Sequence, residues 1–503
     1  MSSLAKGFIS VLGGKVSTML SMVLVTPIVI RLAGNSEYGG FTFAMSVFSM
    51  LLIFTTPGIF DGIRKYLSEE KDDQSWHENV LVFYFSFGSV LAFAVAILLS
   101  LSTYLGYLSE YFDQSVINLF YLVAILLLAE QGVFILRGAH MGLGDEFHSE
   151  LLLFIRSVVF VLFSIGLVYI GLGAEGILAG RVFGSVIASA VGLLYLYPKV
   201  ELTLTEISLR SKLPIKELMT FNIYSAIFIA MTSSLYNIDI ILVQYFLDSE
   251  KTAFYRASLL IAEFLWFVPN ALQTLLLHSA SELWSKDKTK QITNISSDIT
   301  RYNILISLLF LIGIVILAEP FVLIYFGDSF TESINALIIL LPGAFGFAIA
   351  RPVFSIVQGK GELRIIVLGT IIPVAVNIIL NLVLIPIWGI NGAAISTSVG
   401  YGMMILIHGY IAKVVGFNPF LDLKLSRITA TGIISFIIIY IADLAIHSSV
   451  ASLLFIPPLG FVIYAYTGVK LEVLTDAEVG MIQNEILKRY SMVKSQVARF
   501  SGK

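Results

Sequence analysis

The sequence predicts an all-α membrane protein that crosses the bilayer about 14 times. Of its 503 residues, 57% are hydrophobic and only 13% are charged, with a mean hydropathy of +0.91, whereas soluble domains carry about 25% charged residues. Apolar stretches of roughly 20 residues, enough to cross a hydrocarbon core of about 30 Å, recur along the whole chain. Lys and Arg also gather in alternate connecting segments, as expected of a polytopic protein.

The apolar stretches define fourteen expected spans. The first follows Lys6, is too long for the hydrophobic region of a signal peptide and lacks a small-residue cleavage pattern, so we expect it to be retained. The spans cover approximately residues 8–32, 38–60, 79–105, 116–136, 149–171, 176–197, 221–247, 253–281, 302–326, 334–357, 365–388, 389–412, 426–447 and 450–468.

The positive charges orient these spans. Segments after the even-numbered spans are rich in Lys and Arg, whereas the opposite side carries only Arg31 and Lys251. The positive-inside rule then puts both termini in the cytoplasm, which agrees with an even number of spans.

A helical hairpin at Asn377–Tyr401 has a fainter copy beginning at Gly171. In the two segments Gly173, Gly176 and Gly184 match Gly389, Gly392 and Gly400, each at the same offset along the chain. This repeat predicts two related halves. We expect an N-lobe at 1–215, a C-lobe at 216–415, two additional spans within 416–468 and a cytoplasmic tail at 469–503.

The tail differs in composition from the spans. Thr475 and Glu478 have the spacing of a capping box. The residues after them form one apolar stripe at helical spacing, with basic residues beside it (Val479, Ile482, Ile486, Tyr490, Val493, Val497 and Phe500; Lys488, Arg489, Lys494 and Arg499). Two interpretations stay open: an amphipathic helix on the inner leaflet, or a helix docked on the protein's own inner face.

Signatures of enzymes and metal sites are absent from the sequence. Gly13-Gly14-Lys15 is followed by Val16 and is no phosphate-binding loop. No paired-histidine pattern predicts a metal site, and zero cysteines exclude disulfides and thiolate ligands. We expect no cofactor, no metal and no nucleic-acid partner. Short outer loops argue against a membrane glycosyltransferase or polymerase.

Ionisable residues inside the spans are the main candidates for function, because each costs roughly 2.5–3.5 kcal/mol at a helix centre. They are Lys15, Glu130, Arg156, Arg181, Asp239, Arg256, Glu263 and Arg351. Glu130 and Arg156 lie at equal depth on adjacent antiparallel spans, which predicts a structural ion pair. Arg181 and Arg351 lie nearer the ends of their spans and are expected to snorkel or to bind backbone carbonyls.

Asp239 and Glu263 are expected at similar depth on neighbouring spans. Two carboxylates in a low-dielectric cavity would share a proton or a cation, so both are candidates for binding a coupling ion. A structural Asp239–Arg256 pair is the alternative. Lys15, with Arg31 and Arg64, adds positive charge to the first two spans, which suits an anionic cargo such as a phosphate.

Several segments resemble the polysaccharide transporter family, the Wzx-like flippases of the multidrug/oligosaccharidyl-lipid/polysaccharide (MOP) exporter superfamily. Asn377–Tyr401 is similar to the family signature lNxxLNxxLIPxxGixGAAxaT, and the segment 30–39 to RxLGxxxYG. Thr56-Pro57-Gly58-Ile59 and Arg137-Gly138 resemble two further family blocks. The sequence around Phe60 is also similar to that of archaeal members associated with N-glycan assembly.

This resemblance implies a MATE/MOP-like fold with two six-helix lobes around a cavity lined by spans 1, 2, 7 and 8. It also implies a flippase that carries an oligosaccharide linked to a polyprenyl phosphate or pyrophosphate to the outer leaflet of a prokaryotic plasma membrane. Lys15, Arg31, Arg64 and Arg256 become the substrate-cavity candidates. The hairpin at Asn377–Tyr401 carries no charge and lies off the cavity, so it is expected to be scaffold.

The implied partners are membrane lipids, the lipid-linked oligosaccharide, and glycosyltransferases or a polymerase or ligase of the same pathway. The additional spans 13 and 14 are expected to supply a groove for the lipid tail. A cation-coupled drug or metabolite antiporter of the same superfamily stays open as the alternative function.

Overall fold

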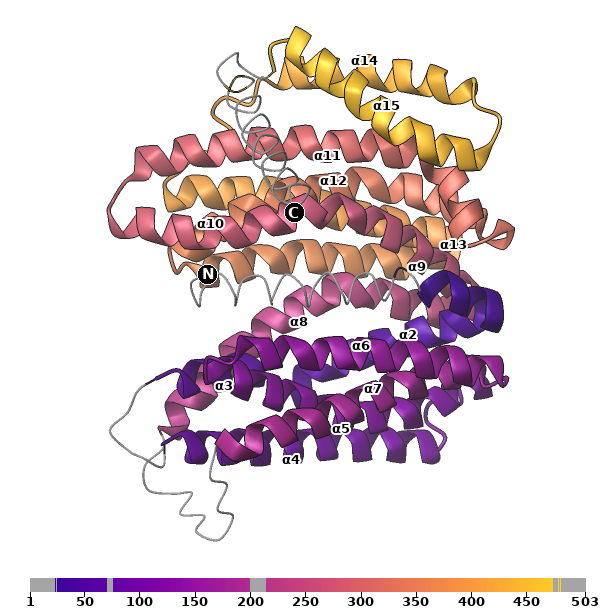
Figure 1. Ribbon diagram of the computed structural model, residues 1–503, viewed down its shortest axis with the longest axis vertical. Coiled ribbons are helices and arrows are strands. Elements are labelled where there is room, and N and C mark those ends of the chain that lie inside the picture. The colour runs from indigo at the N-terminus through magenta and orange to yellow at the C-terminus, as the bar shows by residue number, and fades with distance from the viewer. Residues whose placement is uncertain are drawn as a thin grey trace, which may run out of the picture. The chain divides into compact units, whose positions relative to one another are not determined.

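The computed structural model describes residue 23, residues 25–69, 76–199 and 214–473, and residues 478 and 480 (Figure 1). Within these residues every regular element is a helix. The helices are α2 (Asn35–Thr55), α3 (Ile59–Leu67), α4 (Trp76–Tyr104), α5 (Gln114–Gly142), α6 (Glu146–Tyr169), α7 (Gly173–Leu196), η1 (Tyr197–Lys199), α8 (Ile215–Phe246), α9 (Ser249–Ala262), η2 (Glu263–Trp266), α10 (Phe267–Ser285), α11 (Thr289–Tyr325), η3 (Asp328–Phe330), α12 (Glu332–Gly359), α13 (Leu363–Val415), α14 (Leu425–Leu444) and α15 (Ser449–Lys470).

These helices confirm the predicted fold class, an all-α polytopic membrane protein with about 14 spans. In the part of the chain that the structure describes, 10 helices are long and apolar enough to cross a membrane. One of them, α13, contains two expected spans. The 32-residue α8 and the series α9–η2–α10 correspond to spans 7 and 8, and residues 25–33, also helical, to the end of span 1.

Two predicted spans are interrupted rather than continuous. The second breaks at Thr56-Pro57-Gly58, between α2 and α3, because Pro57 lacks an N–H and Gly58 adopts a left-handed conformation with φ 66°. In the eighth span, the α-helix is interrupted by a turn of 3₁₀ helix at Glu263–Trp266. Such breaks free backbone groups and are typical of functional regions in transporters.

The turn expected after Trp388 is reduced to a single kinked residue within α13. Gly389 has φ 58° and ψ −138°, a conformation that L side chains avoid. Gly173, its counterpart in the earlier copy of the hairpin, also has a positive φ, 46°. A Cβ on Gly392 would overlap the backbone of Leu384, 2.5 Å from its carbonyl carbon. Glycine is therefore required in this hairpin by both φ and space.

Replacing Gly392 by alanine is expected to destabilise the protein by about 1–3 kcal/mol, because backbone cannot move aside as a flexible side chain can. Thermal unfolding of the purified protein measures the effect. Gly313→Ala in α11 is the matched control, since its Cβ would meet no atom within 4 Å. Equal unfolding temperatures for the two variants would contradict the close packing of the hairpin.

The chain divides into two compact units. Unit 1 comprises residues 1–260, 325–340 and 367–400, and unit 2 comprises 261–324, 341–366 and 401–503. In unit 1 the core includes large side chains of α3, α4 and α5, such as Tyr66 and Tyr84, that are almost fully buried. In unit 2 a core cluster joins α11, α14 and α15, for example through Ile312, Ile439 and Ile456. The predicted lobe boundaries remain predictions.

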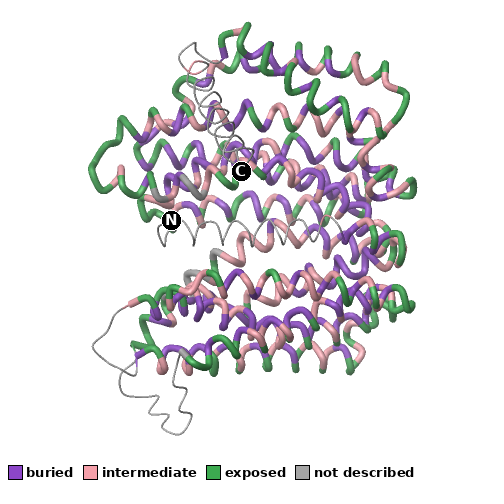
Figure 2. The backbone as a smooth tube through the Cα atoms, in the orientation of Figure 1, coloured by how far each residue is buried: buried purple, intermediate pink, exposed green. Residues whose placement is uncertain are grey.

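Apolar side chains also cover the outside of several helices. Phe85, Phe93 and Ile97 on α4 and Ile433 and Ile437 on α14 are exposed. Figure 2 shows exposed positions recurring along the helices. Exposed apolar surface of this extent is stable only in a non-aqueous environment. These faces are the expected lipid contacts of a multi-pass membrane protein.

Candidate functional site

A buried carboxylate lies at the centre of a polar cluster in unit 1. Asp239 on α8 is only 1% exposed. Asn381 Nδ2 donates to its Oδ1 at 2.6 Å, and Tyr255 Oη donates to its Oδ2 at 3.2 Å. Thr397 Oγ1 also donates to Oδ2. Every one of these donors is a neutral side chain.

Two amides extend the cluster. Asn377 Nδ2 donates to Thr397 Oγ1 at 3.3 Å, and Thr397 Oγ1 lies 2.9 Å from Tyr255 Oη. The amide oxygens of Asn377 and Asn381 are buried and accept no hydrogen bond within the described structure. A carboxylate beside amide and hydroxyl oxygens is a ligand set for a hard cation or a proton. The cluster is therefore a candidate ion-binding site.

Most of these ligands come from the hairpin that the sequence indicated as scaffold. Asn377, Asn381 and Thr397 lie on the two halves of α13, on either side of the Gly389 kink. The interpretation of the hairpin as scaffold considered only charged residues and so did not include these neutral side chains. One signal was present: Asn377 and Asn381 are four residues apart, which puts two amides on one helix face inside an apolar span.

Glu130 and Arg156 lie together, as the sequence suggested, and a third residue joins them. Arg156 Nη1 is 2.9 Å and Arg181 Nη2 is 3.0 Å from the Glu130 carboxylate, which is 1% exposed. Arg181 therefore pairs with a carboxylate, rather than with a carbonyl or the interface as expected. The Arg181 guanidinium also lies 5.9 Å from the centre of the Phe160 ring. This ion group joins α5, α6 and α7, and its structural role stays a prediction.

The break between α2 and α3 borders a small cavity in unit 1. The cavity has a volume of about 360 Å³, and its lining includes Thr56, Asp61, Arg137 and Asn237. Arg64 pairs with Asp61 at 3.3 Å at the surface of α3, with half of its side chain exposed. Arg137 is more buried, and its Nη2 lies 3.3 Å from Glu150. A guanidinium and a carboxylate thus lie near the helix break.

The remaining predicted residues are dispersed. Lys15 lies outside the described residues. Arg31 is exposed, and Arg256 is half-buried on α9. Glu263 begins η2 in unit 2, whereas Asp239 belongs to unit 1, so sharing of one ion by Asp239 and Glu263 stays a prediction. Arg351, on α12 in unit 2, lies 5.0 Å from the centre of the Trp266 ring and 3.3 Å from Gln273 Oε1.

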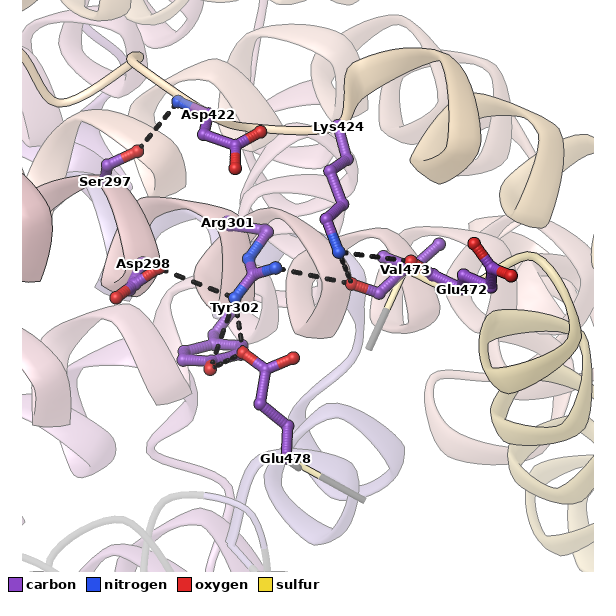
Figure 3. A network of polar contacts seen from close by, with 9 residues as sticks. All are labelled: Ser297, Asp298, Arg301, Tyr302, Asp422, Lys424, Glu472, Val473 and Glu478. Atoms are coloured by element: carbon purple, nitrogen blue, oxygen red, sulfur yellow. Dashed lines mark hydrogen bonds and ion pairs between the residues drawn. The ribbon is translucent and has the colours of Figure 1, made fainter. Parts of the chain in front are cut away.

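Basic side chains of unit 2 bind the segment that follows α15 (Figure 3). Arg301 on α11 donates to the Val473 carbonyl at 3.4 Å and pairs with Glu478, which Tyr302 also contacts. Lys424 donates to the Val473 carbonyl as well, at 3.4 Å. The start of the tail is therefore docked on the protein. Thr475, the other half of the expected capping box, and the whole apolar stripe lie outside the described residues.

Unit 2 also contains a large apolar cavity of about 810 Å³. Helices α11, α12, α13 and α14 contribute its lining, with aliphatic side chains such as Leu308, Ile312 and Ile433. Its few polar lining residues include Tyr410, Lys413 and Thr429. Of the two additional spans, only the first, α14, contributes to the lining.

A family profile described as "Polysaccharide biosynthesis protein" matches residues 28–335, more than half of the chain. The chain belongs to this family. One protein of similar sequence is the "probable low-salt glycan biosynthesis flippase Agl15" of Haloferax volcanii, which is 25% identical over 261 residues, 51% of this chain and 53% of that protein. The "uncharacterized membrane protein MJ1068" of Methanocaldococcus jannaschii is 25% identical over 94% of this chain and 97% of its own length.

Solved structures show the same fold. The structure "Lipid II flippase MurJ, inward closed conformation" superposes with a TM-score of 0.72 at 15% identity, covering 91% of this chain and 98% of the other. A multidrug MATE transporter of the MOP superfamily in an inward-facing conformation gives a TM-score of 0.65 at 14% identity, covering 78% and 94%. This polysaccharide biosynthesis protein therefore has the MOP fold that its sequence motifs predicted.

Proposed function

We propose that this protein is a flippase that moves an oligosaccharide linked to a polyprenyl phosphate or pyrophosphate from the cytoplasmic to the outer leaflet of a prokaryotic plasma membrane. It works by alternating access of two lobes, with both termini in the cytoplasm, and supplies surface polysaccharide or glycoprotein glycan assembly. It acts as a transporter rather than as an enzyme. Glycosyltransferases and a polymerase or ligase of the same pathway would supply and consume its cargo.

The observation that carries this proposal is the apolar cavity of unit 2. Its volume of about 810 Å³ and its aliphatic lining suit an isoprenoid chain. Lys413, near the end of α13, is a cation on the lining of an otherwise apolar space. A lipid-linked substrate carries a phosphate beside its isoprenoid tail. It therefore needs an apolar surface for the tail and a nearby cation for the phosphate, because ammonium and phosphate pair strongly.

The buried Asp239 cluster also suits the drug-antiporter alternative, because a coupling cation serves either cargo. The flippase and the antiporter differ in the cargo that they move. A flippase with this cavity requires the lipid-linked substrate, whereas an antiporter changes the export of small organic cations. Accumulation of a lipid-linked oligosaccharide in a deletion strain, without altered drug tolerance, supports the flippase.

Replacing Arg256 or Lys15 by alanine is expected to lower flipping at least about tenfold, since a charge-assisted contact to phosphate contributes about 1.5–3 kcal/mol. Flipping is measured in proteoliposomes as protection of a lectin-reactive lipid-linked oligosaccharide. Arg427→Ala is the matched control, because Arg427 is exposed and pairs with Glu472 at the end of the chain's last span. Normal flipping by both the Arg256 and Lys15 variants would contradict the binding of an anionic cargo by these two residues.

A further inference from the structure

Two histidines and an aspartate meet where α5 passes into α6. His140, in the last turn of α5, lies with its Nδ1 2.9 Å from Asp145 Oδ2. His148, in the first turn of α6, lies with its Nδ1 2.6 Å from Asp145 Oδ1. One donor atom from each of the three residues lies within 4.8 Å of the other two. Asp145 precedes α6 but makes no side-chain cap to it, so both of its oxygens face the rings.

The contact of the second ring nitrogen of His140, Nε2, indicates which nitrogen carries the hydrogen. Nε2 lies 3.1 Å from the carbonyl oxygen of Gly192 on α7. A carbonyl only accepts, so Nε2 must carry the hydrogen. In the neutral ring, Nδ1 is then a lone pair that points at the Asp145 carboxylate. Two acceptors 2.9 Å apart need either a proton or a metal ion between them.

The surroundings match those of a metal ligand. A metal-binding histidine generally donates its other N–H to a carbonyl or carboxylate, which fixes the ring and its tautomer. His140 has this support from Gly192 and is fully buried. Asp145 and His148 are partly exposed, with 16% and 24% of their side chains accessible, so an ion has a path to the site.

We propose that His140, Asp145 and His148 bind a divalent transition metal, with Zn²⁺ as the best fit. Two imidazole nitrogens and one carboxylate are a ligand set for zinc, and water can supply the fourth position. The metal joins the end of α5 to the start of α6, and through Gly192 to α7, three helices that pack together (Figure 1). It acts as a structural clamp and is independent of the proposed transport function.

The spacing explains why the sequence did not indicate this site. His140 and Asp145 are five residues apart across a loop, and His148 follows three residues later, which is no common zinc motif. The left-handed Gly144, with φ 73°, turns the chain so that the three side chains converge.

The experiment uses the full chain, purified in detergent with a histidine-free tag and stripped of metal by a chelator. Titration with Zn²⁺ against a chromophoric competitor at about pH 7.5, where the ligands are deprotonated, is expected to give one site per chain. His148→Ala and Asp145→Asn should each weaken Zn²⁺ binding at least about 10-fold, the smallest loss typical of an outer-shell partner, because each change removes a direct ligand. His447→Ala is the control, because that histidine is exposed between α14 and α15.

Co²⁺ provides a second readout, since its visible absorption on binding reports nitrogen and oxygen ligands directly. The partly exposed His148 is preferred to the buried His140 as the variant, because removing it carries less risk to folding. Equal Zn²⁺ affinity in wild type and His148→Ala overturns the proposal. Failure of the wild type to bind either metal also overturns it.

Discussion

Asp239→Asn is expected to abolish the response of transport to an imposed ion gradient. The substitution keeps the size of the side chain but removes the one negative charge held by Tyr255, Asn381 and Thr397. Losing about 1.5–3 kcal/mol of cation binding weakens the site about 10-fold or more. Flipping in proteoliposomes under a sodium or a proton gradient measures the effect and identifies the ion.

Two variants accompany this test. Thr397→Val keeps the shape of the side chain and removes one ligand hydroxyl, so a smaller loss in the same direction is expected. Asp113→Asn, at an exposed position before α5, should leave transport unchanged. If wild type and Asp239→Asn respond equally to both gradients, Asp239 is only a structural acceptor. This test measures the response to an ion gradient, whereas the Arg256 variant tests whether the cargo is flipped at all. The two results are therefore independent.

Glu130→Ala is expected to destabilise unit 1 by about 3–5 kcal/mol. The substitution leaves Arg156 and Arg181 buried without their shared carboxylate, since their guanidinium groups lie 2.9 and 3.0 Å from it. The Nε atoms of both arginines already lack a partner within the described structure, so no other acceptor compensates for the loss. Thermal unfolding of the purified protein and its abundance in the membrane measure the effect.

The control is Glu282→Ala, which removes an exposed carboxylate paired with Lys286 one turn away and should leave stability unchanged. A triple variant in which Glu130, Arg156 and Arg181 become methionine tests the cause. It should recover much of the lost stability, because apolar side chains of similar volume need no counter-charge. If the triple variant is as unstable as Glu130→Ala, packing rather than charge pairing explains the loss.

The hydropathy and charge pattern were sufficient to predict the fold class and the approximate span positions. A hydrocarbon environment requires a long apolar run for each crossing, and this requirement is local in sequence. The glycines of the hairpin could also be predicted from the sequence, because a tight hairpin tolerates no side chain at Gly392. The family motifs then indicated the MOP fold.

The polar sites depended on tertiary structure. Asp239 stood out as a charge in an apolar span, but nothing local linked it to Asn381 and Thr397, which follow it by 142 and 158 residues. Arg181 likewise joined Glu130 only once α5 and α7 were packed together. The sequence alone determined where the chain crosses the membrane, because hydrophobic burial is additive along a segment. Only the folded structure decided which buried polar groups meet, because each must find partners wherever the packing of helices brings them.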